Sequence, residues 1–337
     1  MFRGLAALLF DLRFVRCAPW VFCLLCGTVS AQLNRGAYTF LDVPSNARQA
    51  ALGGVNVSLA DKDPSAFISN PALAGDTLSG FAAATYQFYI GDIGHANFAW
   101  LPRLGKLGTV AFGLQHFRYG SIAAYDPSGN ELGDFNADET ALYISKQRQI
   151  RNFRFGLSLK VVSSSLAGFR SEALALDLGG LFIHPENDLT VGLVVKNAGL
   201  VLRDYSPGSN SVLPFDVQAG VTFRPEHMPI RFSATVHRLA QPGEVPTNDA
   251  SGLDKVFRYF NFGTEILIHR NVNVLLGYNY GLHQELKMEN AGGSAGLTYG
   301  FSAHIKTVDF AFSRNTYITG SASYTLSLAV DLRSILR

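Results

Sequence analysis

The stretch Tyr324–Leu332 reads Tyr-Thr-Leu-Ser-Leu-Ala-Val-Asp-Leu, and its apolar and polar side chains alternate. Tyr, Leu and Val residues fall on one face, while Thr, Ser, Ala and Asp residues fall on the other. Successive side chains of a β-strand point to opposite faces, so a period of two predicts a strand with one apolar face.

The same alternation recurs along the chain in segments that are long enough to cross a bilayer as tilted strands. The predicted strands are 79–90, 93–101, 106–118, 138–148, 152–162, 171–183, 188–198, 214–224, 229–238, 257–269, 271–280, 296–305, 307–316 and 321–332. A water-soluble amphipathic β-protein could alternate similarly, but these apolar faces are rich in aromatic residues and leucine. The pattern therefore predicts an all-β fold, a transmembrane antiparallel β-barrel of about 14 strands over residues 79–337.

Composition agrees with a membrane barrel and disfavours an ordinary soluble enzyme. Charged residues make up 16% of the chain, against about 25% in a typical soluble domain. From Gln32 onward, glycine, charged or amide residues interrupt every apolar run before it reaches the length of a membrane helix. Strands rather than helices are therefore expected to cross the membrane.

Residues 1–31 are predicted to be a signal peptide that is cleaved before Gln32. Three arginines precede an apolar core at 18–29, which is too short for a membrane anchor. A lipoprotein signal is disfavoured because Leu25, just before Cys26, is too large for such a site. All three cysteines lie in this segment, so the mature chain is expected to have no disulfide, thiolate zinc site or cysteine nucleophile.

The lengths of the connections predict an orientation. Connections from even-numbered to odd-numbered strands are short, as at Pro185-Glu186-Asn187. The opposite connections are mostly longer and comprise 119–137, 163–170, 199–213, 239–256, 281–295 and 317–320. Short turns on the periplasmic side and long loops on the outer side are typical of outer-membrane barrels, and the sequence therefore predicts location in a bacterial outer membrane.

Residues 32–78 do not follow the strand pattern. Asn46–Gly54 predicts a short helix that ends at a glycine, and Asp61–Leu73 predicts capped turns broken by prolines. Because a barrel of this size leaves space inside, we expect the segment to plug the lumen, with a periplasmic tail as the alternative.

Two short motifs in this segment resemble the hatch motif of the long-chain fatty acid transporter superfamily. They are Asp61-Lys62-Asp63-Pro64-Ser65-Ala66 and Asn70-Pro71-Ala72-Leu73, with Asp61, Asp63, Asn70 and Pro71 as the motif residues. The whole mature chain further resembles the PorQ family of the type IX secretion system. The stretches that carry this resemblance are 40–44, 47–54, 175–180, 184–190, 213–218 and 226–229.

The PorQ resemblance implies a role in a surface attachment complex. Such barrels are expected to tether a large surface-exposed type IX secretion protein, alongside a sortase-like peptidase and a second barrel of the superfamily. That complex processes secreted proteins and attaches them to lipopolysaccharide, so outer-membrane lipid and lipopolysaccharide are the implied lipid partners. One departure is the tail Ser334–Arg337, which lacks the terminal aromatic residue of many outer-membrane barrels.

Motifs for chemistry are lacking. The eight histidines show no metal-ligand spacing, and no nucleophile elbow or phosphate-binding loop is present, so we expect no catalytic site, metal or cofactor. The first 31 residues carry a net charge of +2, as the whole chain does, so the remainder is neutral and no basic face for nucleic acid is expected.

Charged residues on the polar face of the strands are candidate lumen residues, because an Arg or Lys facing mid-bilayer costs about 2–4 kcal/mol. They are Asp177, Lys196, Asp216, Arg224, Arg231 and Glu265, with Asp331 at the chain end. They are expected to hold the plug in a hydrogen-bonded network, or to line a ligand path.

Apolar residues in or beside the long loops are candidates for binding the surface partner, because aromatic residues and methionine are enriched at interfaces. They are Tyr119, Tyr125, Phe135, Tyr205, Leu282 and Met288. Folding back over the barrel mouth is the alternative for these side chains. Three functions thus compete: a secretion-system tether, a transporter or channel for hydrophobic molecules or lipids, and an outer-membrane enzyme.

Overall fold

The structure is a computed structural model, and it describes residues 37–240, 252–286, 293–318 and 321–335. The chain divides into two compact units, residues 1–33 and 34–337, and the described residues all belong to the second. The predicted signal peptide, most of the predicted loop 239–256, and Met288 lie outside the described residues.

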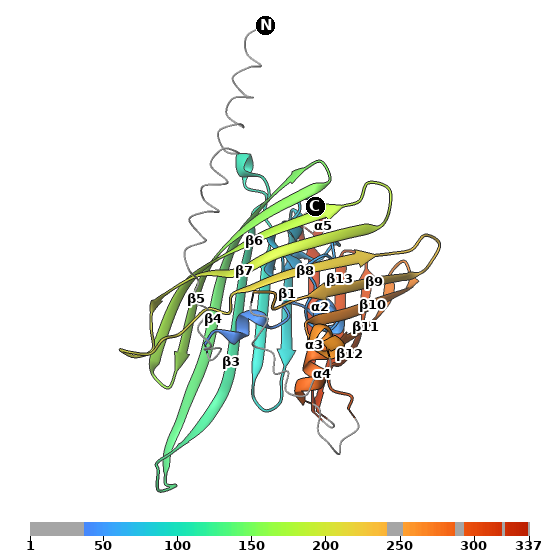
Figure 1. Cartoon of the computed structure of the whole chain (residues 1–337). Helices are drawn as coiled ribbons and strands as arrows, with labels where there is room; N and C mark the ends of the chain where they lie inside the picture. The colour runs from blue at the N-terminus through green and yellow to red at the C-terminus, as the bar shows by residue number, and fades with distance from the viewer. Residues whose placement is uncertain (1–36, 241–251, 287–292, 319–320, 336–337) are drawn as a thin grey trace. The chain divides into compact units, whose positions relative to one another are not determined.

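Fourteen antiparallel strands close into one barrel in which each strand pairs with its neighbours in sequence and β1 pairs with β14 (Figure 1). The predicted transmembrane barrel of 14 strands is confirmed. The strands are β1 (Phe81–Phe88), β2 (Gly94–Trp100), β3 (Ala111–Tyr125), β4 (Glu131–Ile150), β5 (Phe153–Leu166), β6 (Phe169–Ile183), β7 (Leu189–Arg203), β8 (Asp216–Phe223), β9 (Ile230–Val236), β10 (Phe260–His269), β11 (Val272–Asn279), β12 (Leu297–Ile305), β13 (Val308–Ile318) and β14 (Ser321–Asp331).

Alternation along each strand separates an apolar outer face from a packed inner face. On β4, Leu142 and Ile144 are exposed, whereas Ala141, Tyr143 and Ser145 are buried. The exposed series continues on neighbouring strands with residues such as Phe155, Leu157 and Leu193. A continuous outer band of large apolar side chains is what a lipid-facing barrel requires.

Two predicted loops are mostly strand. The predicted loop 119–137 is a continuation of β3 and β4, joined by a turn at 126–130, and the predicted loop 163–170 is a hairpin with its turn at 167–168. The pairing of β3 with β2 ends at Arg118, and the pairing of β4 with β5 ends at Ala137. Further toward the turn at 126–130, β3 and β4 pair only with each other. We call residues 121–136 the ribbon, and Figure 1 shows it projecting from one end of the barrel.

The two ends of the barrel differ in their connections. At the end that carries the ribbon, β7–β8, β9–β10 and β11–β12 are joined by the longer segments, which include α3 (Gly252–Phe257) and α4 (Tyr280–Leu286). The opposite end carries short turns, such as 151–152 and 270–271, together with η5 (Gly105–Leu107) and the C-terminal α5 (Leu332–Ile335). We call these the loop end and the turn end.

Residues 37–78, hereafter the hatch, precede β1 and pack against the inner wall. They form η1 (Thr39–Asp42), α2 (Ala47–Ala51), η2 (Pro64–Ile68), η3 (Pro71–Leu73) and η4 (Asp76–Leu78). The Asn46 side chain accepts a hydrogen bond from Gln49 N at the start of α2, and Gly53 and Gly54 follow its end with positive φ, as the sequence predicted. None of the helices in the described residues is long and apolar enough to cross a membrane.

Candidate functional site

Glycines on the inner face of the barrel bring the hatch backbone into direct contact with the wall. A Cβ on Gly156 of β5 would lie 2.1 Å from Pro71 C, and one on Gly192 of β7 would lie 2.2 Å from Val57 O. On the opposite wall, a Cβ on Gly277 of β11 would lie 2.2 Å from Gly53 N. Only glycine permits approaches this close, so the inner wall is shaped to hold this hatch.

The Asn70–Pro71 motif fixes the hatch to β5 and β6. The Asn70 side chain donates hydrogen bonds to Val57 O at 2.8 Å and to Gly180 O at 3.3 Å, and its Oδ1 accepts one from Ala72 N. Asn70 and Pro71 are both buried. Asp63 has a local role, since its carboxylate accepts a hydrogen bond from Ser65 N at the start of η2. The motif thus positions the hatch against β5 and β6.

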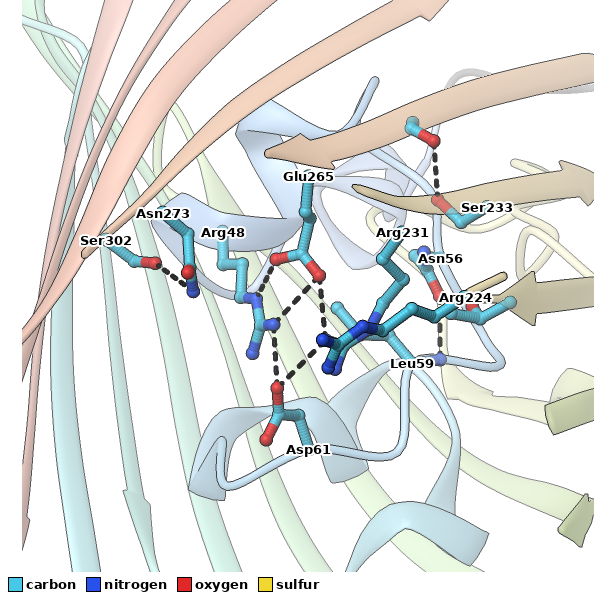
Figure 2. A network of polar contacts seen from close by, with 12 residues as sticks. Arg48, Asn56, Leu59, Asp61, Arg224, Arg231, Ser233, Glu265, Asn273 and Ser302 are labelled. Atoms are coloured by element: carbon cyan, nitrogen blue, oxygen red, sulfur yellow. Dashed lines mark hydrogen bonds and ion pairs between the residues drawn. The ribbon is translucent and has the colours of Figure 1, made fainter. Parts of the chain in front are cut away.

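A second attachment is a four-membered charged network on the other side of the hatch (Figure 2). Arg48 of α2 forms ion pairs with Glu265 at 2.7 Å and with Asp61 at 2.8 Å, and Arg231 forms ion pairs with the same two carboxylates at 2.9 and 3.1 Å. The Arg48 guanidinium holds the pKa of Asp61 well below its usual range. Two hatch residues and two wall residues are therefore joined by opposite charges.

A buried ion pair inside the wall accounts for Asp177. Its carboxylate lies 2.7 Å from Lys160 Nζ and accepts a hydrogen bond from Asn197 N, and neither side chain of the ion pair is exposed. Asn197 adopts a positive φ where β7 departs from regular register with β6. Lys196 and Asp216 are buried and directly opposite in register, and Gln218 donates a hydrogen bond to Asp216.

Arg224 lies at the turn-end rim of the lumen, where it lines one cavity with Asp61 and Arg231. It follows β8 at the turn end, is exposed, and its Nε donates to Met228 O across the turn. It lies beside the charged network in Figure 2 without an ion pair among the described residues. The alternating pattern includes Arg224 because it continues one residue past the last paired position, Phe223. Asp331 forms an ion pair with Arg333 at the chain end.

The predicted partner residues within the described part of the chain fall into three groups. Tyr119 and Tyr205 are partly buried, and their hydroxyls donate to Glu139 at 2.6 Å and to Ser164 at 2.5 Å, so they fold back toward the barrel. Tyr125 is exposed and Phe135 partly exposed, and both lie on the ribbon strands rather than in a loop. Leu282 is partly buried in α4.

An apolar cluster occupies the lumen between the hatch and the inner wall, from β14 through β1 and β2 to β7. Hatch residues Tyr38, Phe40 and Phe67 are fully buried there, and Gln115 of β3 donates a hydrogen bond to Phe40 O at 3.1 Å. Further large members are Leu41, Ile68 and Leu78 of the hatch, Leu101 after β2, and Phe117, Tyr143, Val162 and Leu213 of the wall and the loop end, with Val43, Tyr89, Ile93, Tyr119, Val201 and Tyr205 partly buried against them. A buried aromatic cluster in the lumen distinguishes this barrel from an open polar channel.

Sequence reasoning missed Lys160, Arg48 and the inner glycines as functional positions. Lys160, Gly156 and Gly300 already fell on the polar side of the alternating pattern, which is the signal that marks them as inward-facing. No group of three His, Cys, Asp or Glu side chains in the described part of the chain is placed to hold a metal ion.

Comparisons with known proteins identify similar folds but do not assign the chain to a family. No family model and no curated protein matches the sequence. The structure is similar to the Ralstonia pickettii toluene transporter TbuX (TM-score 0.51, 13% identity), with coverage of 86% of this chain and 97% of TbuX. It is also similar to the P. putida toluene transporter TodX (TM-score 0.51, 14% identity), with coverage of 86% of this chain and 99% of TodX. A Pseudomonas aeruginosa FadL homologue is similar as well (TM-score 0.50, 10% identity), with coverage of 86% of this chain and 98% of the homologue. The chain therefore has the closed-barrel fold of these proteins, an outer-membrane-type barrel.

Proposed function

We propose that this barrel admits hydrophobic molecules across the outer membrane. The observation that carries the proposal is the apolar cluster in the lumen, where Tyr38 and Phe40 of the hatch pack against Phe117, Tyr143 and Leu213. The cluster is packed, so an apolar ligand would enter where these side chains separate, next to the polar groups of Gln115 and Ser171. The likeness to toluene transporters supports the same choice of ligand class.

A pair of leucine substitutions tests the proposal. Leu213 is 7% exposed within the apolar cluster, whereas Leu253 is 74% exposed on α3. We expect cells that express the barrel to take up radiolabelled toluene or oleate faster than cells without it. Leu213→Asp should remove most of that gain, while Leu253→Asp should retain it. Uptake no faster than in cells without the barrel, or unchanged by Leu213→Asp in a folded barrel, would reject the proposal.

We propose as a second candidate that the protein is a component of a type IX surface attachment complex. The observation that favours it is the ribbon, whose strands are not paired with β2 or β5 and whose exposed Tyr125 and Leu132 face solvent beyond the barrel. The PorQ-like stretches, spread from residue 40 to residue 229, supply the class of partner: a large surface protein and a sortase-like peptidase.

Affinity capture from membranes separates the two candidates. The tagged barrel should recover the surface protein and the sortase-like peptidase in mass spectrometry. A variant in which residues 122–135 are replaced by an Asn-Gly turn should lose them. If the intact barrel recovers neither the surface protein nor the peptidase, the attachment role is excluded. The uptake experiment then decides on the first candidate.

A further inference from the structure

Arginines from three segments of the chain line one cavity at the turn end of the barrel. Arg224 follows β8, Arg231 lies on β9, and Arg270 lies in the turn between β10 and β11. The cavity has a volume of about 640 Å³, and Figure 2 shows the side chains of Arg224 and Arg231 side by side. We call it the arginine pocket. Guanidinium groups that share one cavity repel one another unless an anion lies among them.

The carboxylates at this end of the lumen already have partners within the protein. Asp61 lines both the arginine pocket and a neighbouring cavity of about 310 Å³, and it is paired with two arginines. The neighbouring cavity adds two further carboxylates. Asp63 accepts a hydrogen bond from a backbone N–H, and Asp309 Oδ1 lies 2.6 Å from His304 Nδ1. None of these three groups is left to neutralise another cation.

Several cations that line the two cavities have no such partner. Lys62, Arg224 and Arg270 are exposed, and in the described part of the chain none of them forms an ion pair. Arg224 Nε donates only to a backbone carbonyl, at 3.4 Å. Arg231 makes both of its ion pairs through Nη1, and its buried Nε has no hydrogen-bond partner among the described residues. Positive charge and N–H donors are therefore in excess around the arginine pocket.

The number of arginines suits a phosphate group better than a carboxylate. A guanidinium presents a planar fork of N–H donors, and one such fork can bind both oxygens of a carboxylate. A phosphate monoester has three free oxygens and about two negative charges at neutral pH, so it can engage several guanidinium groups at once. Three arginines around one cavity match that second arrangement.

The arginine pocket has room for more than a phosphate group, and part of its lining is apolar. Leu267 and Ile268 line it together with the arginines. Strand β10 departs from regular register between Leu267 and His269, and Ile268 is 65% exposed at this point. Such an irregularity re-aims the neighbouring side chains. Apolar groups thus lie beside the charged ones, where the carbon part of an ester would lie.

We propose that the arginine pocket binds a phosphate monoester. Arg231 is held in place by its two carboxylates, and Arg224 and Arg270 supply the charge that no group of the protein balances. The ester is either a small soluble molecule or a lipid with such a head group, phosphatidic acid, because both present the same phosphate. The inference goes beyond the proposed function, because it concerns a charged ligand outside the apolar cluster.

Two double variants test the site. The pair Arg224→Gln and Arg270→Gln removes two charges from the arginine pocket and leaves the four-membered network intact. The control pair Arg103→Gln and Lys106→Gln removes two exposed charges at the same end of the barrel, outside both cavities. All four residues are exposed, so each variant should keep the fast mobility of a folded barrel in detergent gels.

Binding is measured on the purified barrel in detergent with one soluble and one lipid ligand. Equilibrium dialysis gives the Kd of glycerol 3-phosphate, with glycerate as a carboxylate for comparison. Native mass spectrometry gives the retention of phosphatidic acid, with zwitterionic phosphatidylcholine for comparison. We expect the arginine pair to weaken phosphate binding by about tenfold or more, the effect of one charge-assisted hydrogen bond, and the control pair to bind as the parent does.

The two ligands distinguish the two sources of the phosphate. A weakened binding of glycerol 3-phosphate assigns the site to a soluble ester, whereas an effect on phosphatidic acid alone assigns it to a lipid. Binding of neither ligand to the parent protein, or equal weakening by the two double variants, would overturn the proposed site. Equally tight binding of glycerate, or equal retention of phosphatidylcholine, would overturn the assignment to a phosphate monoester.

Discussion

Gly179 of β6 illustrates how a missing side chain can hold a structure together. A Cβ at this position would lie 2.1 Å from Asn70 Oδ1 and 2.9 Å from Ala72 N, which are themselves hydrogen-bonded to each other. The next residue, Gly180, points the other way, and a Cβ there would meet only Leu193 O at 3.9 Å. Two adjacent glycines of one strand therefore have very different tolerances for a methyl group.

We predict that Gly179→Ala displaces the Asn70–Pro71 turn and lowers the free energy of unfolding by about 1–3 kcal/mol, as overpacking does. Gly180→Ala is the matched control and should behave as the parent protein does. The temperature at which the barrel loses its fast mobility in detergent gels, and proteolysis of the hatch, report the two effects. Equal behaviour of the two variants would contradict the close contact.

Glu265 is the second residue on which the hatch depends. Its side chain is 2% exposed and pairs with two arginines, whereas that of Asp61, which pairs with the same two arginines, is 36% exposed. Neutralising a buried partner leaves uncompensated charge, whereas an exposed partner is replaced by water.

We predict that Glu265→Gln lowers the free energy of unfolding by about 3 kcal/mol, since it leaves Arg48 and Arg231 with one carboxylate between them. Asp61→Asn should lower it by about 1 kcal/mol or less. Urea-induced unfolding in detergent micelles measures both variants against the parent. A larger loss for Asp61→Asn would reverse the assignment of the stronger attachment.

At the scale of elements, the ribbon is the part of β3 and β4 that extends beyond the closed barrel. Its strands pair with each other from Ser121 and Asn136 to Tyr125 and Glu131, and the turn at its tip is held by Asp126, which accepts hydrogen bonds from Ser128 N and Asn130 N. Neither β2 nor β5 reaches it. Its contribution to barrel stability should therefore be small.

We predict that replacing residues 122–135 by an Asn-Gly turn leaves the free energy of unfolding within about 1 kcal/mol of the parent, because such a turn closes two antiparallel strands. The same urea titration checks this. Tyr119 must stay, because its hydroxyl donates to Glu139 inside the mouth. A loss comparable to that of Glu265→Gln would mean that the ribbon supports the barrel directly.

The ribbon is also the part of β3 and β4 that the sequence pattern did not predict as strand. Alternation identifies a strand only where its two faces meet different surroundings, lipid on one side and packed protein on the other. In the ribbon both faces meet water, so the cross-strand pairs Ser121–Asn136 and Ala123–Asp134 follow no regular apolar pattern, and the segment was expected to be a loop. Inside the membrane the contrast is strong, and each of the fourteen strands was predicted. The bounds of β3, β4 and β7 differ from the predicted ones by up to five to seven residues, and those of the other strands agree within four.

At the scale of the whole molecule, the attachment of the hatch could be predicted only in part. Charged residues on the inward face, such as Arg231 and Glu265, could be selected from the sequence, because lipid excludes them. Their partner Arg48 could not, since it lies 217 residues from Glu265 and in a segment without strand periodicity. Likewise, nothing local to Gly179 indicates that Asn70 rests against it.

The two ends of the barrel predict a topology that labelling can test. A peptide tag at 127–129, in the tip of the ribbon, should be reachable by antibody on intact cells, whereas a tag at Pro185–Glu186, in a short turn, should be reached only after permeabilisation. Labelling of the second tag on intact cells would invert the orientation. A tag in the turn 306–307, at the same end as Pro185, is the control for accessibility of the turn end.

The strands of the barrel are unequally joined, and this has a mechanical consequence. β4 and β5 are paired over Ala137–Ile150 and Phe153–Leu166, which is the full length of β5, whereas β8 and β9 meet only over Ala219–Phe223 and Phe232–Val236. Under a pulling force applied to the C-terminus, such a barrel leaves the bilayer hairpin by hairpin, and each rupture force follows the number of ladder bonds broken together. The β8–β9 junction should therefore give the lowest force step, and the steps that extract β3–β7 should be among the highest.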